Sequence, residues 1–272
     1  MRIALGLEYN GAEYCGWQTQ ATKRSVQSEV EAALTKIAHH PITVVAAGRT
    51  DAGVHAYAQV VHFDTHAQRL DHSWVMGGNV NLPTSIRILW AQPVAESFHA
   101  QRSAIARFYR YIIHNRPVRS ALSPQLTTWC YQPLCADAMH RAAQALVGDH
   151  DFTSFRAAGC QSKSPKRIVY FIDVYRNGEQ VLMDICANAF VHHMVRNIAG
   201  SLIAVGSGEK SEHWLKQVLA LKDRTQAGVT APPHGLYFGG IYYPEAFALR
   251  KHALFDRLPE GTKRFSFDKQ HA

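Results

Sequence analysis

The feature that most constrains the fold is an order of strands and helices that occurs twice along the chain. In the first half, apolar residues alternate over 3–9, which is the period of a half-buried strand. Ser25 precedes apolar residues at helical spacing over 26–37, so we expect a helix that Ser25 caps. The pattern further predicts strands at 42–47, 57–65 and 86–91 and a short helix at 71–80. The predicted order of this half is β-α-β-β-α-β.

The second half repeats this plan. Asn177-Gly178 joins two predicted strands and is a strong hairpin signal. Phe190, Met194 and Ile198 lie on one side of a predicted helix over 190–205. The other expected elements are strands at 107–114, 128–132, 166–176, 180–188 and 236–243 and helices at 136–147 and 214–221.

No Gly/Ser-rich or Pro-rich linker separates the two halves, so we expect them to share one sheet. The predicted class is α+β. The predicted division is an N-terminal half over 1–105, a C-terminal half over 106–245 and a tail over 246–272.

The segment G-R-T-D-A-G-V-H-A at 48–56 follows the β-branched run at 42–47. Glycine at both ends frees the backbone for a tight turn and lets another group approach closely. This pattern predicts a loop at a strand end that presents the Asp51 carboxylate, with the Arg49 guanidinium two residues away. An aspartate in a turn, paired with a local arginine, is the simpler interpretation of this segment alone.

Composition narrows the class of protein. The chain has 272 residues, of which 47% are hydrophobic, enough for a sizeable core. Its formal charge of +8 and pI near 9.3 favour a polyanionic partner, nucleic acid first. No apolar run approaches the ~18 residues of a membrane span, and the N-terminus lacks signal-peptide features, so we expect a cytoplasmic protein without membrane attachment.

No pattern of metal ligands is found in the sequence. The five cysteines form no C-x-x-C, and the sixteen histidines form no H-E-x-x-H. His192 and His193 are adjacent, and on the predicted helix they would point about 100° apart. We therefore expect no metal. Walker A, G-x-G-x-x-G and G-x-S-x-G motifs are absent as well.

Several motifs occur in a fixed order. They are Y-N-G at 9–11, G-W-Q at 16–18, the 48–56 segment, N-V-N-L-P at 79–83, R-F-Y-R-Y at 107–111, D-F-T-S-F at 151–155, F-V-H-H-M-V-R-N at 190–197 and G-L-Y at 235–237. In order and spacing they resemble the tRNA pseudouridine synthase A family over roughly residues 2 to 245. Asn10 stands where that family usually has Asp, and Cys15 where it usually has an aromatic residue.

The resemblance implies two RNP-like halves on a central mixed, mainly antiparallel sheet with a cleft between them. It implies isomerisation of uridine to pseudouridine at positions 38, 39 and 40 of the tRNA anticodon stem-loop, by a homodimer that needs no cofactor or metal. Asp51 would be the nucleophile, Arg196 its partner, and Tyr109 the residue that stacks on the uracil. Arg49 would contact phosphate or the flipped nucleotide, and Leu236 would lie beneath the base.

Basic residues with aromatic neighbours suit a surface that follows the RNA backbone. They are Arg107, Arg110, Arg116, Arg119, Arg156, Lys163, Lys166 and Arg167. Two alternatives remain open: a non-catalytic RNA-binding protein with two RRM-like halves, and a glycosylase that releases free uracil. The absence of an RNP1-type aromatic consensus counts against the first alternative.

Overall fold

Ten strands form one sheet in the computed structural model, which describes residues 1–250. The strands are β1 (Arg2–Tyr9), β2 (Val45–Ala46), β3 (His55–Asp64), β4 (Ile86–Val94), β5 (Ala106–Asn115), β6 (Thr128–Cys130), β7 (Gly148–Asp151), β8 (Lys166–Asn177), β9 (Gln180–Ala187) and β10 (Leu236–Tyr242). The helices of the described part are α1 (Val26–Ala38), α2 (Asp71–Asn81), α3 (Ala136–Ala143), α4 (Met194–Gly206) and α5 (Trp214–Leu221).

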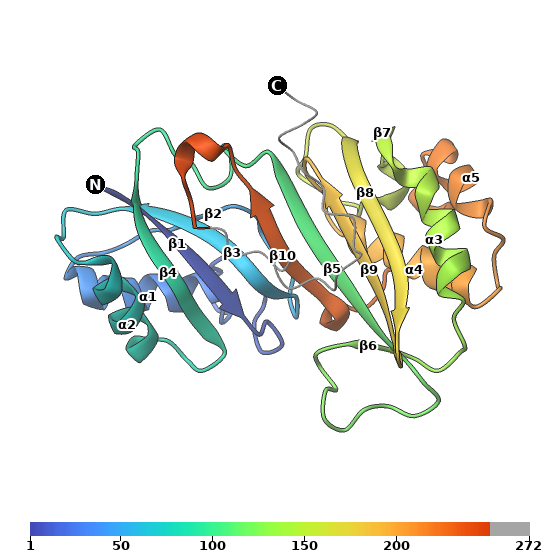
Figure 1. Cartoon of the computed structure of the whole chain (residues 1–272), viewed down its shortest axis with the longest axis horizontal. Coiled ribbons are helices and arrows are strands. Elements are labelled where there is room, and N and C mark those ends of the chain that lie inside the picture. Colours follow the sequence, from blue (N-terminus) through green and yellow to red (C-terminus); the bar gives the residue numbers. More distant parts are fainter. Residues whose placement is uncertain (251–272) are drawn as a thin grey trace.

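The last strand joins the two halves. The sheet order is β4-β1-β3-β10-β5-β9-β8-β7, with β2 paired to β3 and β6 paired to β5 (Figure 1). β10 runs antiparallel to β5 and parallel to β3, with Tyr237 opposite His55. The only other parallel pair among the described strands is β5–β6. The expected α+β class, with a shared and mainly antiparallel sheet, is confirmed.

Helices cover the sheet at its two ends. α1 and α2 lie at the β1–β4 end, while α3, α4 and α5 gather near β8 and β9 (Figure 1). Alternation along β1 sends Leu5 into the main core with Val30 and Leu34 of α1, whereas Ala4 joins a smaller apolar cluster on the opposite face. α1 begins as expected, because the Ser25 hydroxyl accepts a hydrogen bond from the Ser28 amide at 3.2 Å.

Several element boundaries differ from the sequence expectation. The strand expected at 42–47 is only the two residues of β2. The helix expected over 136–147 ends at Ala143 and continues as a 3₁₀ turn to Leu146. Gly178 has the positive φ of 57° that the predicted hairpin requires.

The largest difference concerns the helix expected from Phe190, which begins only at Met194. His193 precedes it with a left-handed backbone, φ 61° and ψ 6°, that no helical residue can have. Phe190 therefore lies outside the helix, and its apolar spacing with Met194 was misleading. The two adjacent histidines lie in the segment that leads into α4, which matters for the site below.

The predicted domain boundary near 105 lies in the connection between β4 and β5. Most of the predicted tail, 251–272, lies outside the described residues. Within the described residues, every helix is too short or too polar to cross a bilayer.

Candidate functional site

A cleft of about 750 Å³ lies where segments from both halves meet. It is lined by residues 47–51 ahead of β3, residues 159–162 ahead of β8, residues 189–196 at the start of α4, and Leu236 at the start of β10. Six of the seven sequence-predicted site residues line it: Asp51, Arg49, Arg107, Tyr109, Arg196 and Leu236. The structure therefore brings together residues that are far apart in the sequence, such as Asp51 and Leu236.

The loop that carries Asp51 is held by the N-terminal motif. The Thr50 carbonyl accepts a hydrogen bond from the Trp17 amide at 3.0 Å, and the Thr50 hydroxyl bonds to the Tyr9 hydroxyl at 2.8 Å. Gly16, at φ 88°, lies so close that a Cβ atom there would come within 2.6 Å of the Thr50 carbonyl oxygen. These contacts join the motifs at 9–18 to the motif at 48–56. Their combined effect is to fix the backbone on which Asp51 stands.

Arg196 lies against the Asp51 carboxylate. Its Nη1 donates to Asp51 Oδ2 at 3.2 Å, and its Nε donates to the Ala231 carbonyl at 2.9 Å. The Ala231 amide in turn donates to the Arg196 carbonyl at 3.1 Å. The arginine side chain is 14% exposed and that of Asp51 27%, so substrate can reach the carboxylate while the guanidinium stays in place.

Two histidines complete the surroundings of Asp51. His192 Nε2 lies 3.5 Å from Asp51 Oδ1, and His193 Nε2 lies 3.3 Å from Asp51 Oδ2. Burial lowers the pKa of His193, while the neighbouring Asp51 carboxylate acts in the opposite direction. The expectation that the adjacent rings diverge was wrong, because both residues precede α4. A left-handed residue at 193 had no sequence signal that we could use.

Tyr109 forms an aromatic wall of the cleft. Its ring meets Phe190 edge-on at 4.9 Å between centroids, and Phe238 in a tilted contact at 4.9 Å. Burial, with the nearby Tyr9 and the Asp51 carboxylate, raises the pKa of Tyr109, so its hydroxyl is protonated at neutral pH. An uncharged aromatic ring of this kind can pack on a base.

Tyr111, two residues along the same strand, has a different environment. It is fully buried, and its hydroxyl bonds to Thr128 Oγ1 at 2.5 Å and to the Pro232 carbonyl at 2.7 Å. The first bond ties β5 to β6, and the second ties β5 to the turn that precedes β10. Tyr111 is therefore a packing residue, in contrast to Tyr109.

The predicted arginines differ in placement. Arg49 is exposed at the cleft. Arg107 also lines the cleft, but its guanidinium donates to the Asn188 carbonyl at 2.8 Å and the Gln101 carbonyl at 2.6 Å. Arg110 is not among the cleft residues; it forms a two-point ion pair with Asp184, at 2.7 Å for each bond. Its predicted contact with substrate stays a prediction, now competing with a structural role.

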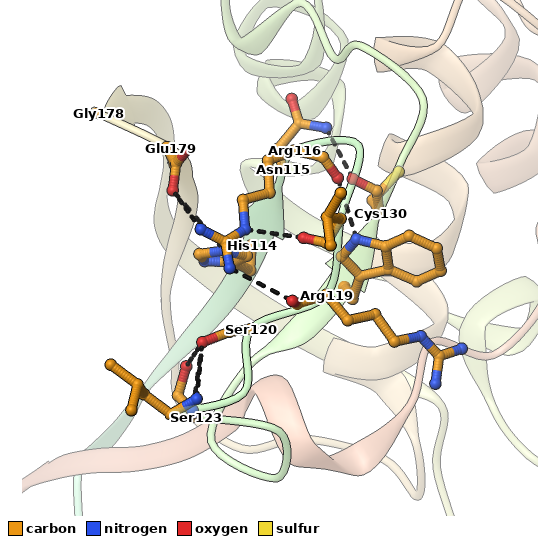
Figure 2. A network of polar contacts seen from close by, with 12 residues as sticks. His114, Asn115, Arg116, Arg119, Ser120, Ser123, Cys130, Gly178 and Glu179 are labelled. Atoms are coloured by element: carbon orange, nitrogen blue, oxygen red, sulfur yellow. Dashed lines mark hydrogen bonds and ion pairs between the residues drawn. The ribbon is translucent and has the colours of Figure 1, made fainter.

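Other basic residues shape loops around the sheet. Arg156 donates to the carbonyls of Cys160 and Ser162, at 2.8 and 2.6 Å, and so closes the loop that lines the cleft. Figure 2 shows the loop between β5 and β6, where Arg116 reaches Glu179 at 3.2 Å and the Arg119 carbonyl at 3.3 Å. Basic composition alone could not separate such loop-stabilising arginines from those that face a ligand.

Comparison with known proteins gives consistent matches. A family described as tRNA pseudouridine synthase matches residues 7–101 and 142–244. A protein named tRNA pseudouridine synthase A from Methylococcus capsulatus is 55% identical over 99% of this chain and 100% of its own length. Proteins of the same name from Nitrosococcus oceani and Escherichia fergusonii are 56% and 54% identical, each over 92% of this chain and over 96% and 93% of their own lengths.

Proposed function

Because this chain belongs to the tRNA pseudouridine synthase A family, whose members isomerise uridine in tRNA, we propose that it acts on positions 38, 39 and 40 of the anticodon stem-loop. We further propose that Asp51 is the nucleophile and that no cofactor takes part. The observation that carries the assignment of Asp51 is its position in the cleft, ion-paired to Arg196 at 3.2 Å and still 27% exposed.

The reaction is a rearrangement. The N1–C1′ glycosidic bond breaks, the uracil turns within the cleft, and C5 bonds to C1′ while C5 loses its proton. A carboxylate that adds covalently to an electrophilic carbon of the nucleotide divides this change into easier steps. Attack on C1′ and attack on C6 both satisfy this requirement. Arg196 serves the nucleophile in either case, because its bond to Oδ2 fixes the orientation of the carboxylate.

Tyr109 and Leu236 supply the base-binding surface. Both are buried residues that line the cleft, 9% and 5% exposed. We propose that the uracil packs against the Tyr109 ring and over Leu236 as it turns. Because the Tyr109 hydroxyl carries its own proton, we propose that it acts as a relay, taking the C5 proton while it passes its own proton to water.

Binding of the RNA has an energetic cost, because the target base must leave the helical stack. Unstacking the base costs about a few kcal/mol. The chain's net charge of +8 favours compensating contacts with phosphates. We propose that Arg49, exposed at the cleft, holds the flipped nucleotide. We also propose that the chain forms a homodimer, because a chain of this size offers limited surface to a whole anticodon arm. We further propose that it acts in the cytoplasm, where tRNA is processed. Light scattering of the purified chain tests the dimer.

Release of tritium from tRNA labelled at uridine C5 tests the proposal. Isomerisation releases tritium and no free base; a glycosylase would release free uracil, and a non-catalytic RNA-binding protein would release neither. Mapping the modified residues in the product tests the assignment to positions 38–40. Absence of tritium release from an anticodon-arm substrate would refute the proposed activity.

A further inference from the structure

The two histidines beside Asp51, His192 and His193, have no role in the proposed chemistry. Among residues 1–250, Asp51, His192 and His193 are the group whose ligand atoms all lie within 4.8 Å of one another. We propose that these three side chains bind a divalent transition-metal ion, zinc in the first place, and that the bound ion inhibits the enzyme by occupying the Asp51 carboxylate.

The spacing of the ligand atoms fits such an ion. Two ligand atoms about 2.1 Å from a zinc ion, at a tetrahedral angle, lie about 3.4 Å apart. His192 Nε2 lies 3.5 Å from Asp51 Oδ1 and His193 Nε2 lies 3.3 Å from Asp51 Oδ2, so each imidazole faces a different oxygen of the carboxylate. Two imidazoles and one carboxylate favour a borderline ion such as zinc over magnesium, which prefers oxygen ligands. The fourth position stays open to water.

The backbone holds the two histidines in place. The His192 amide donates to Cys160 Sγ at 3.3 Å, and the His192 carbonyl accepts from the Ala157 amide at 3.0 Å. The His193 carbonyl accepts from the Asn197 amide at 2.9 Å as the first turn of α4 begins. Because the backbone of both histidines is already fixed, binding an ion orders only their side chains and costs little conformational entropy.

The side chains need only a small adjustment. The two rings lie 4.0 Å apart with a tilt of 39°, so one ring must turn for both lone pairs to meet at one ion. His192 is free to do so, because its side chain is 45% exposed. An ion between the imidazoles faces Oδ1 beside His192 and Oδ2 beside His193. Oδ2 also accepts the Arg196 bond, and a carboxylate oxygen has a second lone pair, so that bond can persist.

The charge of Arg196 should affect the affinity of this site for a metal ion. The positive charge beside the carboxylate opposes a second cation, so a variant that lacks the charge should bind the ion more tightly. With the ion about 5 Å from the guanidinium in a largely aqueous dielectric, the gain is about tenfold in affinity. A non-specific histidine cluster elsewhere on the chain would not respond to this change.

Calorimetric titration of the metal-free, full-length protein with zinc chloride tests the binding. We expect one site that is weakened at least about tenfold in His193→Gln and in Asp51→Asn, and tightened about tenfold in Arg196→Gln. His213→Gln, at an exposed position ahead of α5, is the control and should bind as the wild type does. Equal affinity in wild type, His193→Gln and Asp51→Asn would overturn the proposed site.

The inhibitory consequence rests on the proposed function, so it is measured separately. Tritium release by the wild type should fall as zinc saturates the calorimetric site and should recover when a chelator is added. Full activity with the site saturated would overturn the inhibition. Failure of the zinc-free protein to release tritium would instead refute the proposed function, and the calorimetric result would stand by itself.

Discussion

Replacement of Arg110 by methionine separates a structural role from an RNA-binding one. The Arg110 guanidinium makes two bonds of 2.7 Å to Asp184, whose side chain is fully buried. A third bond, 3.0 Å long, joins Arg110 to the Tyr175 hydroxyl. Methionine fills part of the space but leaves the carboxylate without its cation.

The cost follows from the burial of Asp184. Removing one partner of a buried ion pair typically costs about 3–5 kcal/mol, because an uncompensated charge stays inside. Burial raises the pKa of Asp184, while Arg110 lowers it. Without Arg110 the carboxyl group takes up a proton more readily, which limits the loss, so we expect about 3 kcal/mol. For a chain of this size that corresponds to a fall in Tm of roughly 6–12 °C.

Urea unfolding at pH 7.5 measures this loss, with tRNA affinity measured in parallel on the folded variant. The double variant Arg110→Met/Asp184→Leu should regain much of the stability, because it removes both charges. Arg141→Met, which breaks the solvent-exposed pair with Glu212, is the control and should change stability little. Unchanged stability of Arg110→Met together with weakened tRNA binding would refute the structural reasoning and assign Arg110 to the RNA surface.

Three further changes test other parts of the structure. Arg196→Lys should lower the single-turnover rate by at least about tenfold at unchanged tRNA affinity, since a lysine ammonium lacks the planar fork through which Arg196 bonds to both Asp51 and Ala231; an unaltered rate would contradict this. Tyr109→Phe should keep tRNA affinity but slow tritium release by about 10²-fold, and a normal rate would make Tyr109 a packing residue only. Burial lowers the pKa of His62 to about 4, and the His62 Nδ1 accepts a hydrogen bond from the Ala100 amide at 3.1 Å. The folded state therefore takes up a proton less readily than the unfolded chain does. With respect to His62, the free energy of unfolding should be highest above pH 6.5 and should fall by about 2 kcal/mol as the pH approaches 4. His62→Asn, which keeps an acceptor but cannot titrate, should flatten that part of the urea-stability profile, and an unaltered pH profile would refute the assignment.

Elements with local signals were predictable from the sequence. The cap at Ser25, the hairpin at Gly178 and the helix over 214–221 each depend on neighbouring residues, and each is present. The motif at 48–56 likewise predicted a loop after a strand, and the structure shows Asp51 in such a loop.

Features that depend on distant contacts were not predictable in the same way. The position of β10 between β3 and β5 depends on pairing across more than 100 residues, which no local pattern encodes. The pairing of Arg110 with Asp184 has the same cause, since both alternate normally along their strands. At His193, tertiary contacts impose a left-handed backbone where apolar spacing predicted a helix, so propensity was overridden.

The central claim is that Asp51 is the nucleophile, and the Asp51→Asn variant tests it most directly. Asparagine has nearly the same shape, so folding and tRNA binding should persist, but its amide is a far weaker nucleophile. Single-turnover tritium release from C5-labelled tRNA should fall by about 10⁴-fold or more, which is roughly 5 kcal/mol of barrier. Asp149→Asn, at an exposed aspartate, is the control and should react as the wild type does. Normal tRNA binding with almost no release is the predicted result; release within tenfold of the wild-type rate would contradict the mechanism and leave Asp51 as an ion-paired turn residue.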